Sequence, residues 1–357
     1  KYFASPKDMG SEKNWHINWD KVRIAQCFLD AFICLLVYFA VRIIYQGPAW
    51  PALVSAFLYS LSFYNIYYTK ALLSESLAAF LLSLSVLLYL LWLKQDYRWG
   101  LGLSGACFGL TILTRPEYIL LPLAMAAYIF LRNRNTFSEA AKNALIFILS
   151  VIIIIAPWTL RNYLVFKKPV MIATGELGYS LFLGTFEGSQ AWHGWGDIPE
   201  GMSQGSRGKV VSLYDKWDYF MRTGGIKIMD IDRSFMKLAQ ARIRERPFAC
   251  LQSWLHNIRR LWYQNYIPMY LYKEPSGGFF IFYFLSALYA FFKSPGQEKA
   301  LMAPVGIIFA YLSVVFLPLH IEPRYGVALM PAIICLSGLG LWKILKTIAG
   351  AMPFNAN

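Results

Sequence analysis

Charged residues are scarce in this chain, where they make up 15% of 357 residues, against about 25% in soluble globular proteins. Acids are the scarcer sign: 20 Asp and Glu face 34 Lys and Arg, a formal net charge of +14. The deficit argues against a soluble enzyme, a disordered chain and a collagen-like fibre. In a soluble protein the excess of bases would suggest nucleic acid as a partner. In a chain this apolar, the excess of bases first suggests Lys and Arg concentrated in the cytoplasmic loops of a membrane protein.

Motifs for metals, disulfides and nucleotides are missing as well. The five cysteines form no Cys-x-x-Cys pair, so neither a zinc site nor a disulfide framework is supported. The four histidines have no metal-ligand spacing; they are His16, His193, His256 and His320. No Walker motif, glycine-rich nucleotide loop or Gly-x-Ser-x-Gly elbow occurs. Nucleotide-dependent chemistry in solution is therefore not supported.

Long apolar stretches, by contrast, are abundant, and 57% of the residues are hydrophobic. About 20 mostly apolar residues are enough to cross a bilayer as a helix. Nine membrane helices are predicted, some of them short: 22–45, 50–69, 71–93, 99–113, 118–131, 143–160, 277–292, 301–319 and 325–345. A spanning helix satisfies its own backbone hydrogen bonds, so we expect an all-α integral membrane protein.

Polar segments divide these helices into regions. We expect residues 1–20 to be the remnant of a first outer loop and 21–160 to hold the first six membrane helices. Residues 161–275 are predicted as a long loop region, 276–346 as the last three membrane helices, and 347–357 as a cytoplasmic tail. The chain opens without an initiator Met or a signal peptide, and we expect it to lack its natural beginning.

Bases are unevenly distributed among the short loops. One set of loops, together with the C-terminal end, carries ten bases and three acids: Arg42, Lys94, Arg98, Arg132, Arg134, Lys142, Lys293, Lys299, Lys343 and Lys346, with Asp96, Glu139 and Glu298. The positive-inside rule places this set in the cytoplasm. Nine spans then place residues 1–20 and 161–275 on the periplasmic or lumenal side.

The long region 161–275 is predicted to be ordered. It opens with glycines and aromatic residues typical of a turn-rich loop: Gly175, Gly178, Gly184, Gly188, Gly194, Gly196, Tyr179, Phe182, Trp192 and Trp195. Two amphipathic helices are predicted next, over 232–245 and 248–263, with Pro247 between them. They are typical of helices lying at a membrane surface, but ordinary packing against a core explains the pattern equally well.

The short turns on the outer side pair acids with bases. Ionisable groups at the ends of spans are costly unless they are paired, hydrated or used. A base that snorkels beside an acid explains any single pair, whereas the whole set on one face indicates a polar cavity. Its members are Lys70, Glu75, Arg115, Glu117, Arg161, His320, Glu322, Arg324 and Tyr325.

Such a cavity suits a phosphate close to the bilayer, because arginine and lysine recognise phosphate oxygens. A neighbouring acid suits a general base that deprotonates an attacking hydroxyl or amine. Together these groups favour a donor in which a sugar is linked to a lipid phosphate that leaves during transfer. The aromatic, glycine-rich loop is a candidate platform for a sugar ring.

Several motifs resemble the polyprenyl-phosphate-sugar-dependent glycosyltransferases of the GT-C superfamily, in the subgroup of protein O-mannosyltransferases and lipid A aminoarabinose transferases. The general motifs are Val22–Tyr38, Leu72–Leu77 and Gly105–Glu117. Others are similar to a bacterial branch of that subgroup: Ala156–Tyr163, Gly178–Gly184, Ala241–Pro247 and Glu322–Pro331. The resemblance covers nearly the whole chain, and it rests on the order and spacing of motifs that are individually weak.

The resemblance implies a multi-helix membrane enzyme that performs an inverting transfer at the periplasmic or lumenal face, most simply in a bacterial inner membrane. The implied donor is an undecaprenyl- or dolichyl-phosphate sugar, and the acceptor is a glycan, a lipid or a protein. Membrane lipids are expected as further partners, and nucleic acid is not. Glu75 matches an acid at the outer end of a span, and Arg324 matches a basic residue suited to the lipid phosphate. Arg115 and Arg161 match motif positions without an assigned role.

One departure from the subgroup concerns its catalytic acid, which sits just after the first span. The chain starts beyond that point, so the principal base is expected upstream of Lys1, with Asp8 and Asp20 as the candidates within the chain. Glu75 is predicted as a supporting acid. The substrate or lipid phosphate is expected to bind to the remaining members of the cavity: Lys70, Arg115, Glu117, Arg161, His320, Glu322, Arg324 and Tyr325.

Other interpretations stay open. No resident metal is predicted, although a divalent cation at the acids is compatible with the sequence. Another GT-C enzyme, such as a mannosyltransferase that builds a lipid-linked glycan, fits the last outer turn. A transporter of lipid-linked sugars is favoured less, because transporters usually show internal repeats and charges at the bilayer midplane. A catalytically inactive GT-C-like assembly partner would fit a chain without the principal acid.

Overall fold

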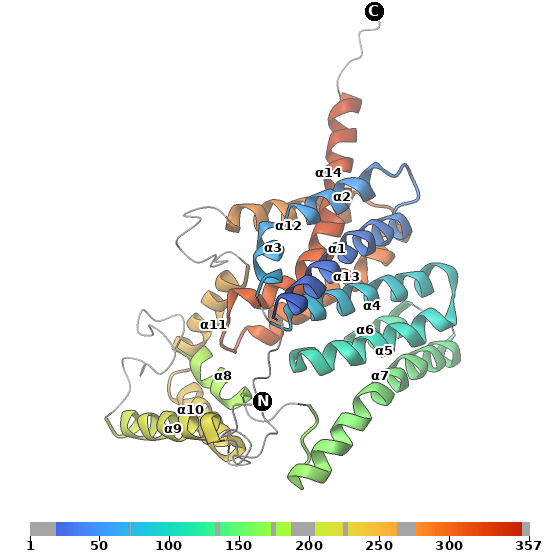
Figure 1. Cartoon of the computed structure of the whole chain (residues 1–357). Coiled ribbons are helices and arrows are strands. Elements are labelled where there is room, and N and C mark those ends of the chain that lie inside the picture. The colour runs from blue at the N-terminus through green and yellow to red at the C-terminus, as the bar shows by residue number, and fades with distance from the viewer. Residues whose placement is uncertain are drawn as a thin grey trace, which may run out of the picture. The chain divides into compact units, whose positions relative to one another are not determined.

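The computed structural model describes residues 19–71, 73–132, 136–172, 176–186, 204–223, 228–262 and 276–351, and these residues contain helices and no strand (Figure 1). The elements are α1 (Trp19–Ile44), α2 (Trp50–Ser60), α3 (Phe63–Thr69), α4 (Glu75–Gln95), α5 (Arg98–Thr114), η2 (Pro116–Tyr118), α6 (Leu121–Arg132), α7 (Phe137–Phe166), α8 (Leu177–Gly184), α9 (Gln204–Thr223), α10 (Ile228–Glu245), α11 (Pro247–Trp262), α12 (Ser276–Lys293), α13 (Gly296–Phe316), η3 (Pro323–Leu329) and α14 (Met330–Ala351).

Five segments of the described chain are long and apolar enough to cross a bilayer as helices: 20–44, 75–95, 137–166, 296–316 and 324–349. Each of them coincides with a predicted span. The helices α5, α6 and α12 are shorter and also coincide with predicted apolar stretches. The structure therefore confirms the prediction of an all-α membrane protein.

The predicted span over 50–69 is wrong as a continuous helix, because α2 ends at Ser60 and α3 begins at Phe63. A buried chain of hydrogen bonds holds this break. The Ser62 hydroxyl donates to Asn65 Oδ1 at 3.0 Å, and Asn65 Nδ2 donates to the Tyr59 hydroxyl at 2.9 Å. Such local side-chain bonds compete with continuation of a helix.

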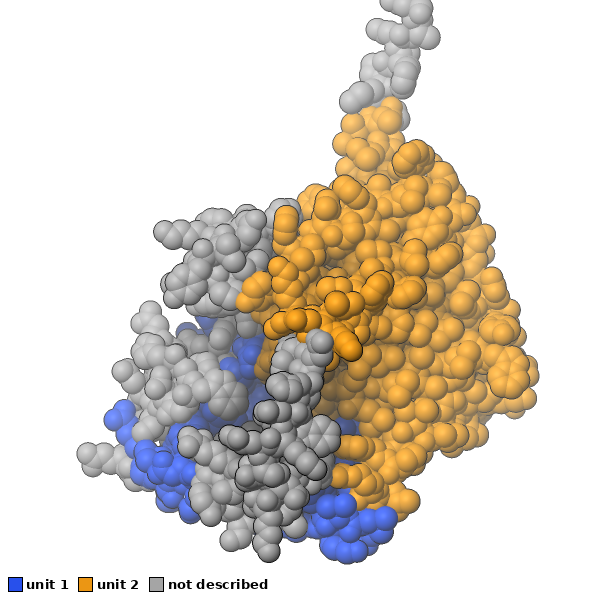
Figure 2. All heavy atoms as spheres, in the orientation of Figure 1, with its two compact units in different colours: residues 1–19, 162–260, 314–322 blue, residues 20–161, 261–313, 323–357 orange. Residues whose placement is uncertain are grey.

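The chain divides into two compact units, which Figure 2 colours separately. The first comprises residues 1–19, 162–260 and 314–322, and the second comprises 20–161, 261–313 and 323–357. Most of the predicted loop region thus belongs to the first unit, and the apolar helices from α1 to α6 and from α12 to α14 belong mainly to the second.

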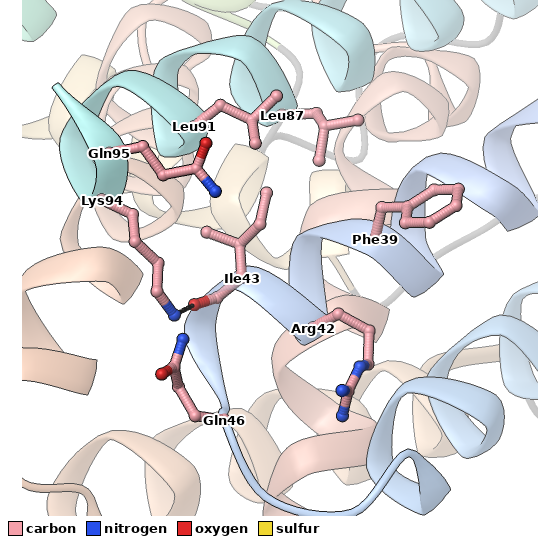
Figure 3. A pocket seen from close by; sticks show the side chains of 8 residues that line it. All are labelled: Phe39, Arg42, Ile43, Gln46, Leu87, Leu91, Lys94 and Gln95. Atoms are coloured by element: carbon pink, nitrogen blue, oxygen red, sulfur yellow. Dashed lines mark hydrogen bonds between the residues drawn. The ribbon is translucent and has the colours of Figure 1, made fainter. Parts of the chain in front are cut away.

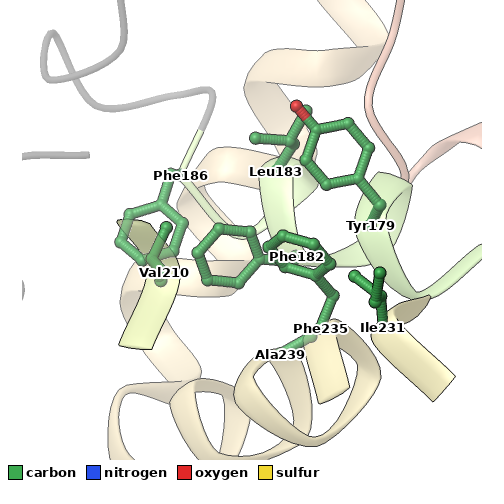
Figure 4. Close-up of a cluster of buried hydrophobic side chains, with 8 residues drawn as sticks. All are labelled: Tyr179, Phe182, Leu183, Phe186, Val210, Ile231, Phe235 and Ala239. Atoms are coloured by element: carbon green, nitrogen blue, oxygen red, sulfur yellow. The ribbon is translucent and has the colours of Figure 1, made fainter. Parts of the chain in front are cut away.

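The first unit has its own aromatic core between α8 and α10. Phe182 and Phe235 lie at its centre, and Tyr179 and Phe186 pack beside them (Figure 4). The Asp232 carboxylate accepts the backbone N–H groups of Gly178 and Tyr179 at 3.1 and 2.9 Å. These bonds satisfy donors that the first turn of a helix leaves open.

The prediction of a turn-rich loop is wrong around Gly178 and Gly184, because both lie within α8. A Cβ on Gly178 would overlap the Asp232 carbonyl, and one on Gly184 would overlap the Pro318 carbonyl. These glycines therefore allow close approach of backbones rather than turns. The other loop glycines singled out above, and Trp192 and Trp195, lie outside the described residues.

The two predicted amphipathic helices are present as α10 and α11, and they bury different faces. On α10 the apolar side chains of Ile231 and Phe235 are buried, so ordinary packing explains this helix. On α11 the polar side is the buried one: Ser253 donates to the Thr185 carbonyl and Asn257 to the Leu317 and Leu319 carbonyls. An apolar stripe of α11 is left exposed, formed by Phe248, Leu251, Leu255 and Ile258.

In the second unit, α14 packs closely against α2 and α12. Two glycines of α14 make this possible. A Cβ on Gly338 would overlap Ser55 of α2, and one on Gly340 would overlap the Ser286 carbonyl of α12. Small residues that let backbones approach are typical of helix contacts within membranes.

Gly340→Ala is expected to destabilise the protein by about 1–3 kcal/mol, the usual range for overpacking, because a backbone carbonyl blocks the new methyl group. The matched control is Gly306→Ala in α13, where no atom lies within 4 Å of the added carbon. The control should leave stability unchanged or raise it by up to about 1 kcal/mol. Thermal unfolding of both variants in detergent measures the difference. Equal melting temperatures would contradict the close packing of α14 on α12.

Candidate active site

Four charged residues meet at one end of the second unit. Glu75 is the first residue of α4, Arg115 lies between α5 and η2, Glu117 lies in η2, and Arg324 lies in η3. The site forms because α4 packs against both α5 and η3, while η2 follows α5 directly. The structure thus brings together side chains from three of the predicted acid–base turns.

Glu75 is the centre of this group, with 4% of its side chain exposed. Its Oε1 atom accepts Nη1 of Arg115 at 2.7 Å and lies 3.5 Å from Nε of Arg324. The Nε atom of Arg115 also bonds Oε1 of Glu117. Two bases therefore balance two acids, as burial of charge requires.

The other oxygen of Glu75, Oε2, is buried and has no hydrogen-bond partner in the described part of the chain. Buried acceptors almost always have a partner from the protein or from ordered water. Because Oε1 of Glu75 faces the two arginines and Oε2 has no partner, Oε2 is the atom that can accept a hydrogen bond or a proton from a bound ligand.

The two arginines differ in their surroundings. The Arg115 side chain is 11% exposed and lies between two carboxylates. Burial alone would lower the pKa of Arg115, but Glu117, Tyr118 and Glu75 together raise that pKa above its usual value, so the guanidinium stays charged. The Arg324 side chain is 29% exposed and makes the longer contact with Glu75. Arg324 is therefore the better placed of the two to meet an incoming anion.

Tyrosines line the charged group. The Tyr325 ring lies 4.9 Å from the Arg115 guanidinium carbon and 5.8 Å from that of Arg324, within reach of a cation–π interaction. Buried Tyr64 and Tyr118 interact electrostatically with Glu75 and Arg115.

A further tyrosine fixes the turn that carries Glu117. The Tyr311 hydroxyl on α13 donates to the Glu117 carbonyl at 2.7 Å and accepts the N–H of Leu120 at 3.2 Å. The sequence reasoning missed Tyr64, Tyr118 and Tyr311. Tyr118 directly follows Glu117, and Tyr64 belongs to the aromatic run 63–68, so both had a local signal; Tyr311 had none.

The remaining predicted residues have other surroundings. Lys70 is exposed at the end of α3, and Asp20 is exposed and pairs with Arg23 at 3.1 Å. Arg161 on α7 lies 5.0 Å from the Trp158 ring. No ion pair links Lys70 or Asp20 to Glu75 or Glu117 in the part of the chain that the structure describes. Asp8 lies outside the described residues.

His320 and Glu322 belong to the first unit. His320 is buried, and its backbone N–H donates to the Ser180 carbonyl of α8 at 2.8 Å. Its Nε2 atom lies 4.0 Å from Oε1 of Glu322. Within this unit, His320 therefore anchors the segment after α13 to α8.

A second polar network lies inside the apolar helices and was also missed. Asp30 on α1 accepts the Tyr59 hydroxyl at 2.6 Å, and Tyr59 in turn accepts Asn65. One turn earlier on α1, Gln26 donates to the Leu73 carbonyl at 2.7 Å. Leu73 stands two residues before Glu75, so this face of α1 helps to fix the start of α4. An acid in the middle of an apolar run was the available signal.

A resident divalent cation does not fit the charged group. Glu75 and Glu117 already face guanidinium groups, which compete with a cation for the carboxylate oxygens. The described residues contain no group of three or more His, Cys, Asp or Glu side chains that could hold a metal ion.

Residues 16–160 match the family model of the dolichyl-phosphate-mannose-protein mannosyltransferases. This match confirms the resemblance to that subgroup over residues 16–160 and supports a membrane glycosyltransferase of the GT-C type. The resemblance of the motifs beyond residue 160 stays a prediction. The matched range contains Glu75, Arg115 and Glu117, whereas Arg324 and Tyr325 lie beyond it. No curated protein matches the chain.

Proposed function

We propose that this protein is an inverting glycosyltransferase that moves a sugar from a polyprenyl-phosphate donor to a glycan, lipid or protein acceptor. The observation that carries the proposal is the arrangement around Glu75. One carboxylate oxygen faces two arginines, and the other is buried and has no hydrogen-bond partner in the described part of the chain. This arrangement supports a phosphate and a hydroxyl-bearing group binding side by side.

In this proposal, Arg324 binds the phosphate of the donor, and Arg115 adds a second positive charge beside it. Charge-assisted bonds from guanidinium to phosphate are strong and directional. During transfer, the bond between the anomeric carbon and the phosphate oxygen breaks, and the electron pair leaves with the phosphate. Arg324 and Arg115 stabilise the charge that develops there, a stabilisation that lowers the barrier.

The acceptor oxygen or nitrogen attacks the anomeric carbon from the side opposite the phosphate, which inverts the configuration. The open oxygen of Glu75 accepts a hydrogen bond from a hydroxyl of the bound substrates and orients it. The proton released by the acceptor passes to a general base, for which the resemblance points to the segment ahead of α1. Asp8 and Asp20 are the candidate bases of this chain.

We also propose that the charged group faces the periplasm in a bacterial inner membrane. Bases are enriched in the loops at the opposite ends of the spans, and such enrichment is typical of the cytoplasmic side. Lys70 and Arg161 are proposed as further contacts for lipid phosphate, with His320 and Glu322 as contacts for a sugar or acceptor.

The test is mass spectrometry of lipids and surface glycans from cells with and without the gene, followed by an assay of the full-length protein. Cells without it should lose one sugar from a glycan, lipid or protein and accumulate the polyprenyl-phosphate sugar. The purified protein should release polyprenyl phosphate in proportion to the sugar transferred.

Two outcomes would contradict the proposal. Movement of the intact donor across vesicle membranes, without release of polyprenyl phosphate, would indicate a transporter. Loss of the glycan from cells, with no transfer by the purified protein from any donor tested, would indicate an inactive assembly partner.

A further inference from the structure

A cavity of about 290 Å³ lies between the end of α1 and the end of α4. Figure 3 shows Arg42 and Phe39 on the α1 side and Leu87, Leu91 and Lys94 on the α4 side. All of its lining residues are described by the structure. The cavity has no part in the function proposed above.

Both ionisable residues that line this cavity are basic. Lys94 Nζ donates to the Ile43 carbonyl at 2.7 Å, and Arg42 Nη1 donates to the Gly47 carbonyl at 2.7 Å. Neither base forms an ion pair with a described residue. A lysine has three donors and an arginine five, so donors remain on both side chains beyond these bonds.

Helix capping explains the two hydrogen bonds but not the cavity. Bases near a helix C-terminus are favoured by its partial negative charge, and Lys94 and Arg42 both occupy such positions.

Among the described residues that line this cavity and its neighbour, acids occur only in the neighbouring cavity. Asp96 and Glu139 line a neighbouring cavity of about 440 Å³, which shares Lys94 with the first and also contains Arg132. With Arg42 included, three bases therefore face two acids across both cavities. The excess of positive charge lies on the side of Arg42, where the lining holds no acid.

The apolar lining continues from the bases along the two helices. Leu87 and Leu91 are one turn apart on α4, and the Phe39 ring on α1 is 51% exposed. A cavity lined by bases at one part and by apolar side chains at another matches a phospholipid. The bases suit its charged headgroup, and the apolar side chains suit its acyl chains.

The position on α4 sets this cavity apart from the charged group. Lys94 follows Glu75 by 19 positions within one helix, which is about 28 Å at 1.5 Å per residue. The hydrocarbon core of a bilayer is about 30 Å thick. The cavity therefore belongs to the opposite face of the membrane from Glu75.

We propose that this cavity binds the phosphate of an anionic phospholipid, with Arg42 and Lys94 on the phosphate and an acyl chain along Phe39, Leu87 and Leu91. The proposal is independent of the transferase function, because it concerns the other end of α4 and needs no sugar donor.

The test uses the purified full-length protein in detergent, titrated with phosphatidylglycerol or phosphatidylcholine and followed by native mass spectrometry. Each base near a headgroup contributes about 1 kcal/mol. Replacing both bases in Arg42→Gln/Lys94→Gln should therefore weaken phosphatidylglycerol binding by about 30-fold. Glutamine keeps an amide donor for the two carbonyls. Binding of phosphatidylcholine should stay nearly unchanged.

The matched control is Arg98→Gln/Lys142→Gln, which removes the same charge from two exposed bases outside the cavity. It should keep the preference for phosphatidylglycerol. Leu91→Trp keeps both bases but fills the apolar part of the cavity, and it should weaken binding of the same lipid even if the double variant does not fold.

Three results would overturn the proposal. The first is an unchanged preference for phosphatidylglycerol in both Arg42→Gln/Lys94→Gln and Leu91→Trp. The second is an equal loss in the control pair, which would indicate attraction by overall charge. The third is occupancy by inorganic phosphate at the same affinity as the lipid, which would indicate a site for a free anion.

Discussion

Glu75→Gln is expected to reduce glycosyl transfer per folded molecule by at least about 100-fold, the lower end of what a positioned acid contributes. The amide keeps the size of the carboxylate but removes the charge that two arginines share. The substitution also replaces a carboxylate by a neutral amide, which is a poorer hydrogen-bond acceptor at the position of Oε2. The measurement is the rate of polyprenyl phosphate release at saturating donor and acceptor.

A loss of folding has to be separated from a loss of chemistry, because breaking a buried ion pair costs about 3–5 kcal/mol. Glu117→Gln is the matched control: it removes one partly buried acid from the same group, and the other partner of Arg115 is kept. If Glu75 acts through its open oxygen, Glu117→Gln should keep more activity at a similar melting temperature, and Glu75→Asp should restore part of the rate. Near-normal transfer in folded Glu75→Gln would refute the role assigned to Glu75.

Arg324→Ala should lower the rate of transfer strongly at donor concentrations that just saturate the unaltered protein. A hydrogen bond to a charged group is worth about 1.5–3 kcal/mol, which corresponds to roughly 10- to 100-fold in kcat/KM. Because Arg324 is the more exposed arginine of the group, much of the effect should appear as a higher KM for the donor. Steady-state kinetics at several donor concentrations separate KM from kcat.

Lys142→Ala is the control for Arg324→Ala, since it removes an exposed base on α7 that has no place in the proposed site. It should leave the KM for the donor unchanged. Arg324→Lys tests geometry, because lysine keeps the charge but lacks the planar fork that binds phosphate through two donors. A normal KM in folded Arg324→Ala would exclude Arg324 from donor binding.

The apolar architecture was predictable because a bilayer imposes a length and a composition on each span. The ends of α4 and α5 were predictable for the same reason, so the sequence already pointed to Glu75 and Arg115. The break between α2 and α3 was not, because Ser62 and Asn65 act through hydrogen bonds that hydropathy does not register.

The charged group was predictable only as a set of separate turns. Hydropathy placed Glu75, Glu117 and Arg324 at one face of the membrane. That Arg115 and Arg324 both approach the same oxygen of Glu75 follows from the packing of η3 on α4, which hydropathy does not predict. The role of Tyr311 depends on packing across nearly 200 positions of sequence, so no local pattern could reveal it. Gly178 and Gly184 misled the prediction, because a glycine required by close packing looks the same in sequence as one required by a turn.

The exposed stripe on α11 has a practical consequence for the region between α7 and α12. That region has a core of its own, which makes it attractive to express separately for antibody production or crystallisation. Phe248, Leu251 and Leu255 would then face water, and an exposed apolar patch of this kind promotes self-association. A shortened protein of this type needs a detergent or lipid present from the moment of cell lysis, as a membrane protein does.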